Sequence, residues 1–211
     1  MSDGKSEGIY YFSREGKQNL RKTITLVGAA AARWNLFKVV MFTADGDGPL
    51  RAAKSFAGKE IQVIACTFPR GTTVAGREST RVPTGIPDPN VREQLQANGV
   101  EIVQAGLPFD DAFIPGADDS KLKTIVQTMN LVSGGLSLCI QAVIMATEAG
   151  LVSQGEPVIA MSADTAIVAT GARKQRLFAP DGLVVQRFIC KPEALDISRQ
   201  PKPHPTPQAT S

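Results

Sequence analysis

Histidine is almost absent from this chain of 211 residues. The single histidine, His204, lies in "RQPKPHPTPQATS", where proline occupies every second position from 201 to 207. Such a segment forms neither a helix nor a strand ladder, so we do not expect His204 in a catalytic site. The sequence therefore excludes Ser-His-Asp hydrolysis, Cys-His proteolysis and histidine-ligated zinc chemistry.

The chain also has few cysteines and a small net charge. Cys66, Cys139 and Cys190 lie far apart in apolar runs, without CxxC spacing, which predicts reduced core residues and no metal site. A formal charge of +3 and the lack of a basic stripe with aromatic residues argue against nucleic acid and membrane partners. No apolar run is long enough to span a bilayer and "MSDGKSEG" is polar, so we expect a cytoplasmic protein.

What the chain does contain is an alternation of buried strands and amphipathic helices. Leu20, Ile24, Val27, Ala31 and Trp34 recur at helical spacing. Continuous apolar strands between such helices indicate a parallel sheet covered on both faces. We expect strands at 8–13, 37–43, 60–68, 100–105, 157–161, 165–171 and 182–191, and helices at 20–34, 49–57, 89–98, 122–129 and 134–150.

The predicted fold is a three-layer α/β/α sandwich around a mixed, mainly parallel sheet. Asp88 and Pro89 predict a capped helix start, and residues 70–87 predict a long loop. The short turns between the last three strands predict antiparallel neighbours. We expect one domain over residues 8–197 and a disordered, proline-rich tail over 198–211.

Several segments, in consistent order over residues 8–192, carry a family resemblance: "IYYFSREGKQN", "VVMFTADGDGPLRAAKSFAGKEIQVIACT", "CIQAVIMATEAGLV", "SADTAIVATGA" and "RFICKP". The chain resembles the small archaeal and bacterial proteins that look like the C-terminal α/β domain of pyruvate kinase standing alone. The resemblance implies the same sandwich fold and flavin mononucleotide (FMN) as the ligand, with no settled reaction. Within pyruvate kinase this domain is not catalytic, and in some members it holds a phosphorylated sugar effector.

The first candidate site follows the strand at 37–43. In pyruvate kinase the corresponding loop grips a phosphate, and here that position is Thr43, Ala44, Asp45, Gly46, Asp47 and Gly48. Ligands of open parallel sheets bind at the carboxyl ends of the strands, where helix N-termini and free N–H groups lie. Asp45 and Asp47 instead favour an ordinary helix cap and turn. Both interpretations stay open, with the acidic groups bonded to ribityl hydroxyls in the first.

Two further segments are candidates for the same ligand. Thr67, Phe68, Arg70 and Gly71 follow the next strand, where an aromatic ring can stack on a flavin and an arginine fork suits a phosphate. Arg77 and Arg81 lie farther along the same loop. The third segment holds Ser162, Asp164 and Thr165, which form either a tight strand connection or a wall of the site. Gly134 and Gly135 open the buried helix, as an anion site or a plain break.

The predicted function is FMN binding with no assigned reaction. The alternative is a non-catalytic sensor or regulatory module that binds a phosphorylated metabolite. Neither a GxGxxG fingerprint nor a P-loop occurs, and Glu148 is expected to be exposed. We also expect a homo-oligomer, because strands 8–13 and 182–191 are apolar candidates for the sheet edges. In the competing interpretation, the first helix and the Arg70 loop cover both edges within a monomer.

Overall fold

The protein folds around one seven-stranded sheet. The computed structural model describes residues 6–75, 81–109 and 120–198. The strand order is β1-β9-β8-β7-β2-β3-β6, and β8 alone runs against the other strands. The strands are β1 (Tyr10–Arg14), β2 (Lys38–Phe42), β3 (Gln62–Thr67), β6 (Glu101–Gln104), β7 (Pro157–Met161), β8 (Ala166–Thr170) and β9 (Val185–Ala194).

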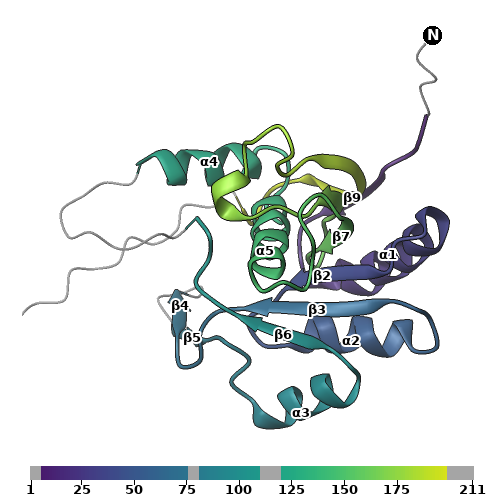
Figure 1. Ribbon diagram of the computed structural model, residues 1–211, viewed down its shortest axis with the longest axis vertical. Coiled ribbons are helices and arrows are strands. Elements are labelled where there is room, and N and C mark those ends of the chain that lie inside the picture. The colour runs from purple at the N-terminus through teal and green to yellow at the C-terminus, as the bar shows by residue number, and fades with distance from the viewer. Residues whose placement is uncertain (1–5, 76–80, 110–119, 199–211) are drawn as a thin grey trace, which may run out of the picture.

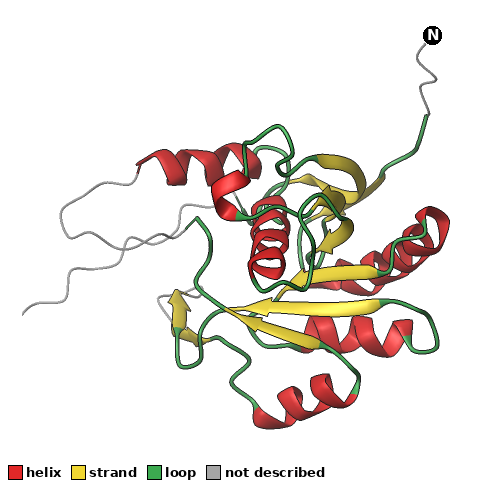
Figure 2. Cartoon of the chain, in the orientation of Figure 1, coloured by secondary structure: helices red, strands yellow, loops and turns green. Residues whose placement is uncertain are grey.

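Helices cover both faces of this sheet, as Figure 2 shows. α1 (Leu20–Trp34), α2 (Asp47–Phe56) and α3 (Pro89–Ala97) pack on one face, while α4 (Ser120–Asn130) and α5 (Leu136–Glu148) lie on the other (Figure 1). The buried face of α1 carries Leu20, Ile24, Val27 and Ala31, at the spacing that predicts it. Nearly every residue of α5 is buried, as expected of a central helix. The predicted three-layer α/β/α fold is confirmed.

The order of the last strands also agrees with the prediction. β7 pairs antiparallel with β8, and β8 pairs antiparallel with β9. Asp88 caps α3 through a hydrogen bond from the Asn90 N–H, with Pro89 at the first helical position. Short 3₁₀ turns occur at Lys17–Asn19 and Lys174–Arg176.

Two expectations about the strands are wrong. The segment predicted as a plain loop at 70–87 contains an antiparallel hairpin of β4 (Thr73–Ala75) and β5 (Arg81–Pro83). β9 is not a sheet edge, because it lies between β1 and β8. The two edges are β1, as expected, and β6. The two hairpin strands have only three residues each, and for β9 the sequence pattern gives a strand but not its neighbours.

The register of the three central strands decides where the candidate site lies. β2 lies between β7 and β3, with Met41 beside Met161 and Ala65. The three strands are parallel, so the residues that follow them emerge together at the carboxyl edge of the sheet. Of the helices in the described parts of the chain, none is long and apolar enough to cross a membrane. The tail beyond Ser198 lies outside the described residues.

Candidate functional site

The three predicted segments meet at the carboxyl edge of the sheet. The Thr43 N–H donates to the Cys66 carbonyl over 2.9 Å, and the Ser162 N–H donates to the Thr165 carbonyl over 2.8 Å. These bonds continue the pairing of β2 with β3 and close the turn from β7 to β8. The three segments therefore lie together at the carboxyl edge of the sheet, as the sequence predicts: residues 43–48, 67–71 and 162–165.

Within Thr43–Gly48, side chains of the loop take up the backbone donors. The Gly46 N–H donates to Thr43 Oγ1 over 2.9 Å, and the Asp47 N–H donates to Asp45 Oδ1 over 3.2 Å. Thr43 Oγ1 donates in turn to Asp45 Oδ1 over 3.3 Å. This network is a turn that leads into α2, whose N-cap residue Gly46 makes no side-chain capping bond. The N–H groups of Gly46 and Asp47 are therefore already bonded within the loop.

The two glycines of this loop have packing reasons to be glycine. Gly46 has a φ of 85°, and a Cβ built on it would lie 2.7 Å from Val91 Cγ1 and 3.1 Å from both Ile86 Cγ2 and Leu95 Cδ1. A Cβ on Gly48 would meet the thioether end of Met41. Both positions are buried. Core side chains occupy the space that a Cβ would need at both positions, so these glycines do not by themselves indicate a close ligand.

Asp164 organises the third segment. Its carboxylate is buried and accepts from the Gly16 N–H over 2.8 Å, from Thr165 Oγ1 over 3.1 Å and from Ser162 Oγ over 3.3 Å. Gly135, at the start of α5, leaves no room for a Cβ beside Ser162 and Thr165. This cluster joins the end of β1, the turn from β7 to β8 and the start of α5. The cluster therefore forms a tight connection between β7 and β8.

The charge of this part of the edge is mainly negative. Lys17 donates to Asp45 Oδ2 over 3.0 Å, and the Glu15 carboxylate accepts from the N–H groups of Ile197 and Ser198. Burial raises the pKa of Asp45, but the hydrogen bonds from Lys17, the Asp47 amide and Thr43 outweigh it, so the pKa lies below its usual value. Asp45 is therefore a carboxylate at neutral pH. Together with Asp164 it makes Thr43–Gly48 a poor place for a phosphate.

Positive charge gathers instead where β3 and β6 end. Arg70 is exposed, and no hydrogen bond or ion pair of its side chain occurs within residues 6–75, 81–109 and 120–198. Arg92 on α3 donates to the carbonyls of Gly85 and Ile86. Burial, and then the nearby charge of Arg70, lowers the pKa of Arg92. The two guanidinium groups are thus near enough for their charges to interact, and neither forms an ion pair among the described residues.

Aromatic and hydroxyl groups adjoin this pair of arginines. Phe68 is half-buried and meets Phe42 edge to face, with ring centroids 5.1 Å apart. Thr67 is completely buried, and its Oγ1 has no hydrogen-bond partner among the described residues. An unsatisfied buried hydroxyl costs about 1–3 kcal/mol. Gly71 has a φ of 79° and open space around it, as in an ordinary turn. Arg81 lies on β5, and Arg77 lies outside the described residues.

Several residues at this edge were not singled out from the sequence. They are Phe42, Glu15, Gly16, Lys17 and Arg92. Phe42 ends a strand beside Thr43, so strand periodicity could have identified it. The others come from the turn that follows β1 and from α3, and only the strand order brings them to this edge.

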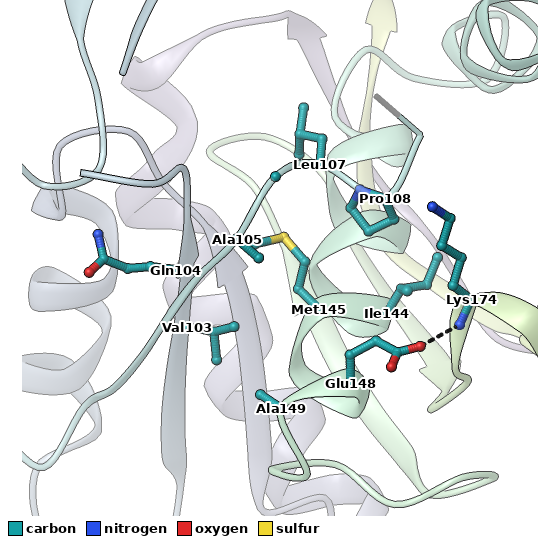
Figure 3. Close-up of a pocket in the computed structure, with 11 residues that line it drawn as sticks. Val103, Gln104, Ala105, Leu107, Pro108, Ile144, Met145, Glu148, Ala149 and Lys174 are labelled. Carbon is teal, nitrogen blue, oxygen red and sulfur yellow. Dashed lines mark hydrogen bonds between the residues drawn. The ribbon is translucent and has the colours of Figure 1, made fainter. Parts of the chain in front are cut away.

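A groove lies on the α5 face, and two of its lining residues, Gln104 and Ala105, also bond to the backbone of Phe68 and Thr67. Figure 3 shows it between α5 and the segment that follows β6, with a volume of about 470 Å³. Its walls include Val103, Leu107, Pro108, Ile144 and Met145. The Glu148 carboxylate, exposed as predicted, accepts from the Lys174 N–H at one end. Residues 110–119 follow directly on this segment and are outside the described part of the chain.

The cysteines offer no nucleophile. All three are free and buried, as predicted. Burial raises the pKa of Cys66 and of Cys190 to about 12, and it raises that of Cys139 as well. No group of three or more potential metal ligands occurs among the residues that the structure describes.

Comparison with known proteins adds no assignment. A scan against protein-family models finds no match, and a search of the curated proteins finds no significant match.

Proposed function

We propose that this protein binds flavin mononucleotide at the carboxyl edge of the sheet, with the phosphate beside Arg70. The observation that carries the proposal is the exposed Arg70, whose charge acts on Arg92, two residues after the half-buried Phe68. The family resemblance supplies the identity of the ligand. The geometry supports a phosphate and a ring at this edge, and it favours the residues after β3 over Thr43–Gly48 for the phosphate.

Charge decides the position of the phosphate. A dianion beside Asp45 and Asp164 would meet two carboxylates, and the N–H groups of Gly46 and Asp47 already have acceptors. A dianion beside Arg70 and Arg92 would relieve the repulsion between two like charges. It would also gain the two parallel hydrogen bonds that a guanidinium offers. The residues after β3 therefore suit a phosphate better than the loop after β2.

The remaining parts of the ligand have partners along the same edge. Phe68 presents a partly exposed aromatic surface, and Phe42 supports it from β2. The Asp45 carboxylate is half-exposed and can accept from the hydroxyls of a ribityl chain. The Thr67 hydroxyl lacks a partner, but it is enclosed, so a ligand atom reaches it only after the covering atoms move. When bound, the flavin would supply a redox-active ring.

Replacement of Arg70 tests the phosphate position. The loss of a charge-assisted hydrogen bond pair costs about 1.5–3 kcal/mol, so Arg70→Ala should weaken FMN binding roughly tenfold to a hundredfold. Riboflavin lacks the phosphate, and its affinity should not change. Arg21→Ala, on the exposed face of α1, is the matched control and should bind both ligands as the parent does. Equal losses for FMN and riboflavin would show that Arg70 does not act on the phosphate, and no loss for either would remove Arg70 from the site.

A sensor role remains the second candidate, and one feature favours it. Asp45 and Asp164 bind the turn after β1 through Lys17 and Gly16, and Glu15 of the same turn binds the segment that follows β9. A ligand that competes for Asp45 would therefore loosen the turn after β1. Turnover separates the two roles. An enzyme would cycle its flavin with NAD(P)H or another donor, whereas a sensor would bind the ligand and turn nothing over.

A further inference from the structure

The β1 edge of the sheet is unusually apolar for a strand with an open side. Six large apolar side chains lie exposed along it or beside it. Tyr10 keeps 41% and Tyr11 47% of its surface exposed. Lys191 links the strand to the segment before α5, since its ammonium lies over the Tyr11 ring and donates to the Val132 carbonyl. The set, called the β1 patch below, is Ile9, Tyr10, Tyr11, Leu131, Val132 and Ile197.

The opposite edge is built differently. β6 exposes Glu101 and Gln104, while Val103 is buried. Polar and charged residues on an edge strand discourage pairing with another chain. β1 lacks that protection at Tyr10 and Tyr11, although Arg14 gives it one charge at its end. The two edges therefore differ in the property that governs association.

We propose that the β1 patch binds a second copy of this chain, with the two β1 strands antiparallel across a two-fold axis. An edge strand that pairs with itself about such an axis joins the two sheets into one. Phe12 is the central residue of Tyr10–Arg14, so an axis at Phe12 pairs all five residues, and any other register pairs fewer. This proposal does not depend on the flavin.

The same register matches the side chains. Residues directly opposite each other in an antiparallel pair lie on the same face of the sheet. With the axis at Phe12, Tyr10 faces Arg14 of the second copy and Tyr11 faces Ser13. Tyr10 and Arg14 are both exposed, and an arginine over a tyrosine ring is a favourable pair. The two Arg14 side chains are held apart from each other.

Strand pairing alone would make a small interface. Stable interfaces bury roughly 1,200–2,000 Å² in total, more than five paired residues supply. Leu131, Val132 and Ile197 extend the apolar surface beside β1. Exposed apolar surface of this kind costs free energy in water, and a second molecule that covered it would remove that cost.

The oligomeric mass tests this proposal directly. Wild-type protein should have twice the 22.4 kDa mass of one chain by light scattering, and dilution should dissociate it. Tyr10→Lys places like charges opposite each other twice per dimer, so the dissociation constant should rise by roughly tenfold to several hundredfold. Adding Arg14→Glu to Tyr10→Lys should restore the dimer. Phe178→Lys is the control, because Phe178 is, among the described residues outside the patch, the most exposed large apolar one, at 82%.

Disulfide trapping tests the register without relying on affinity. The variant Tyr10→Cys/Arg14→Cys should form a covalent dimer under mild oxidation, because opposite residues of an antiparallel pair are close enough for a disulfide. Each single variant should remain uncrosslinked, and the three native cysteines are buried. A mass of 22.4 kDa over a hundredfold range of concentration, with no cross-link, would overturn the proposal. A dimer that resists Tyr10→Lys and fails to cross-link would overturn the β1 interface.

Discussion

Gly46 offers a sharp test of how the loop after β2 is built. In Gly46→Ala the backbone keeps a φ of 85°, which costs an L-residue roughly 1–2 kcal/mol. The new Cβ would lie 2.7 Å from Val91 Cγ1, and Ile86 and Leu95 behind it are fully buried. Overpacking of this kind costs typically 1–3 kcal/mol. The free energy of unfolding should therefore fall by about 2–5 kcal/mol, and the melting temperature by roughly 4–20 °C.

Urea unfolding, followed by the fluorescence of the single tryptophan and by circular dichroism, measures this loss. Gly58→Ala is the matched control, because Gly58 has a φ of 76° and nothing within 4 Å of a Cβ. Gly58→Ala should therefore lose only the free energy that a side chain costs at a positive φ. The double variant Gly46→Ala/Val91→Ala removes the closest contact of the new Cβ. Its loss in free energy of unfolding should therefore be smaller than the sum of the losses of the two single variants. Equal losses for Gly46→Ala and Gly58→Ala would refute the packing role of Gly46.

Two further predictions concern single polar groups at the carboxyl edge. Asp45→Ala removes the acceptor of the Asp47 N–H and should lower the free energy of unfolding by about 1 kcal/mol at pH 7. The pKa of Asp45 lies below its usual 3.8 in the folded protein, so the stability difference between the parent and Asp45→Ala should persist above pH 3.8 and shrink as the pH falls below it. Urea unfolding across pH 2–7 measures this difference. A difference that stays constant over this range would contradict the role of the carboxylate. Thr67→Val removes the buried hydroxyl that has no described partner, so it should raise the free energy of unfolding by about 1 kcal/mol, and a clear loss in the same assay would show that the hydroxyl is satisfied.

The fold could be predicted because its signals are local. Helical spacing from Leu20 to Trp34, the Asp88–Pro89 start of α3 and the apolar runs of β2 and β3 each specify an element within a few residues. The alternation of these elements then implies a parallel sheet. The β4–β5 hairpin escaped prediction because "TVA" and "RVP" are too short to show a strand period.

The neighbours of each strand were harder to predict. β9 carries the apolar residues of an edge that associates, yet β1 covers it in the same chain. Neither periodicity nor composition records which strand lies beside which. The same limit applies to the site: the ends of β2, β3 and β7 were expected to meet, but Arg92, Gly16 and Lys17 reach the edge only through the strand order. Side-chain bonding also showed that the N–H groups of Gly46 and Asp47 already have acceptors within the loop.

An amide-resolved NMR titration of the wild-type protein with flavin mononucleotide tests the central claim most directly, because it reports binding and location together. Saturable shifts should gather at residues 67–71, with further shifts at 43–48 and 162–165. Riboflavin should shift the amides near Phe68 but leave those around Arg70 nearly unchanged. No shifts at a large excess of FMN would contradict flavin binding, and shifts confined to the groove between α5 and the segment after β6 would contradict the proposed site.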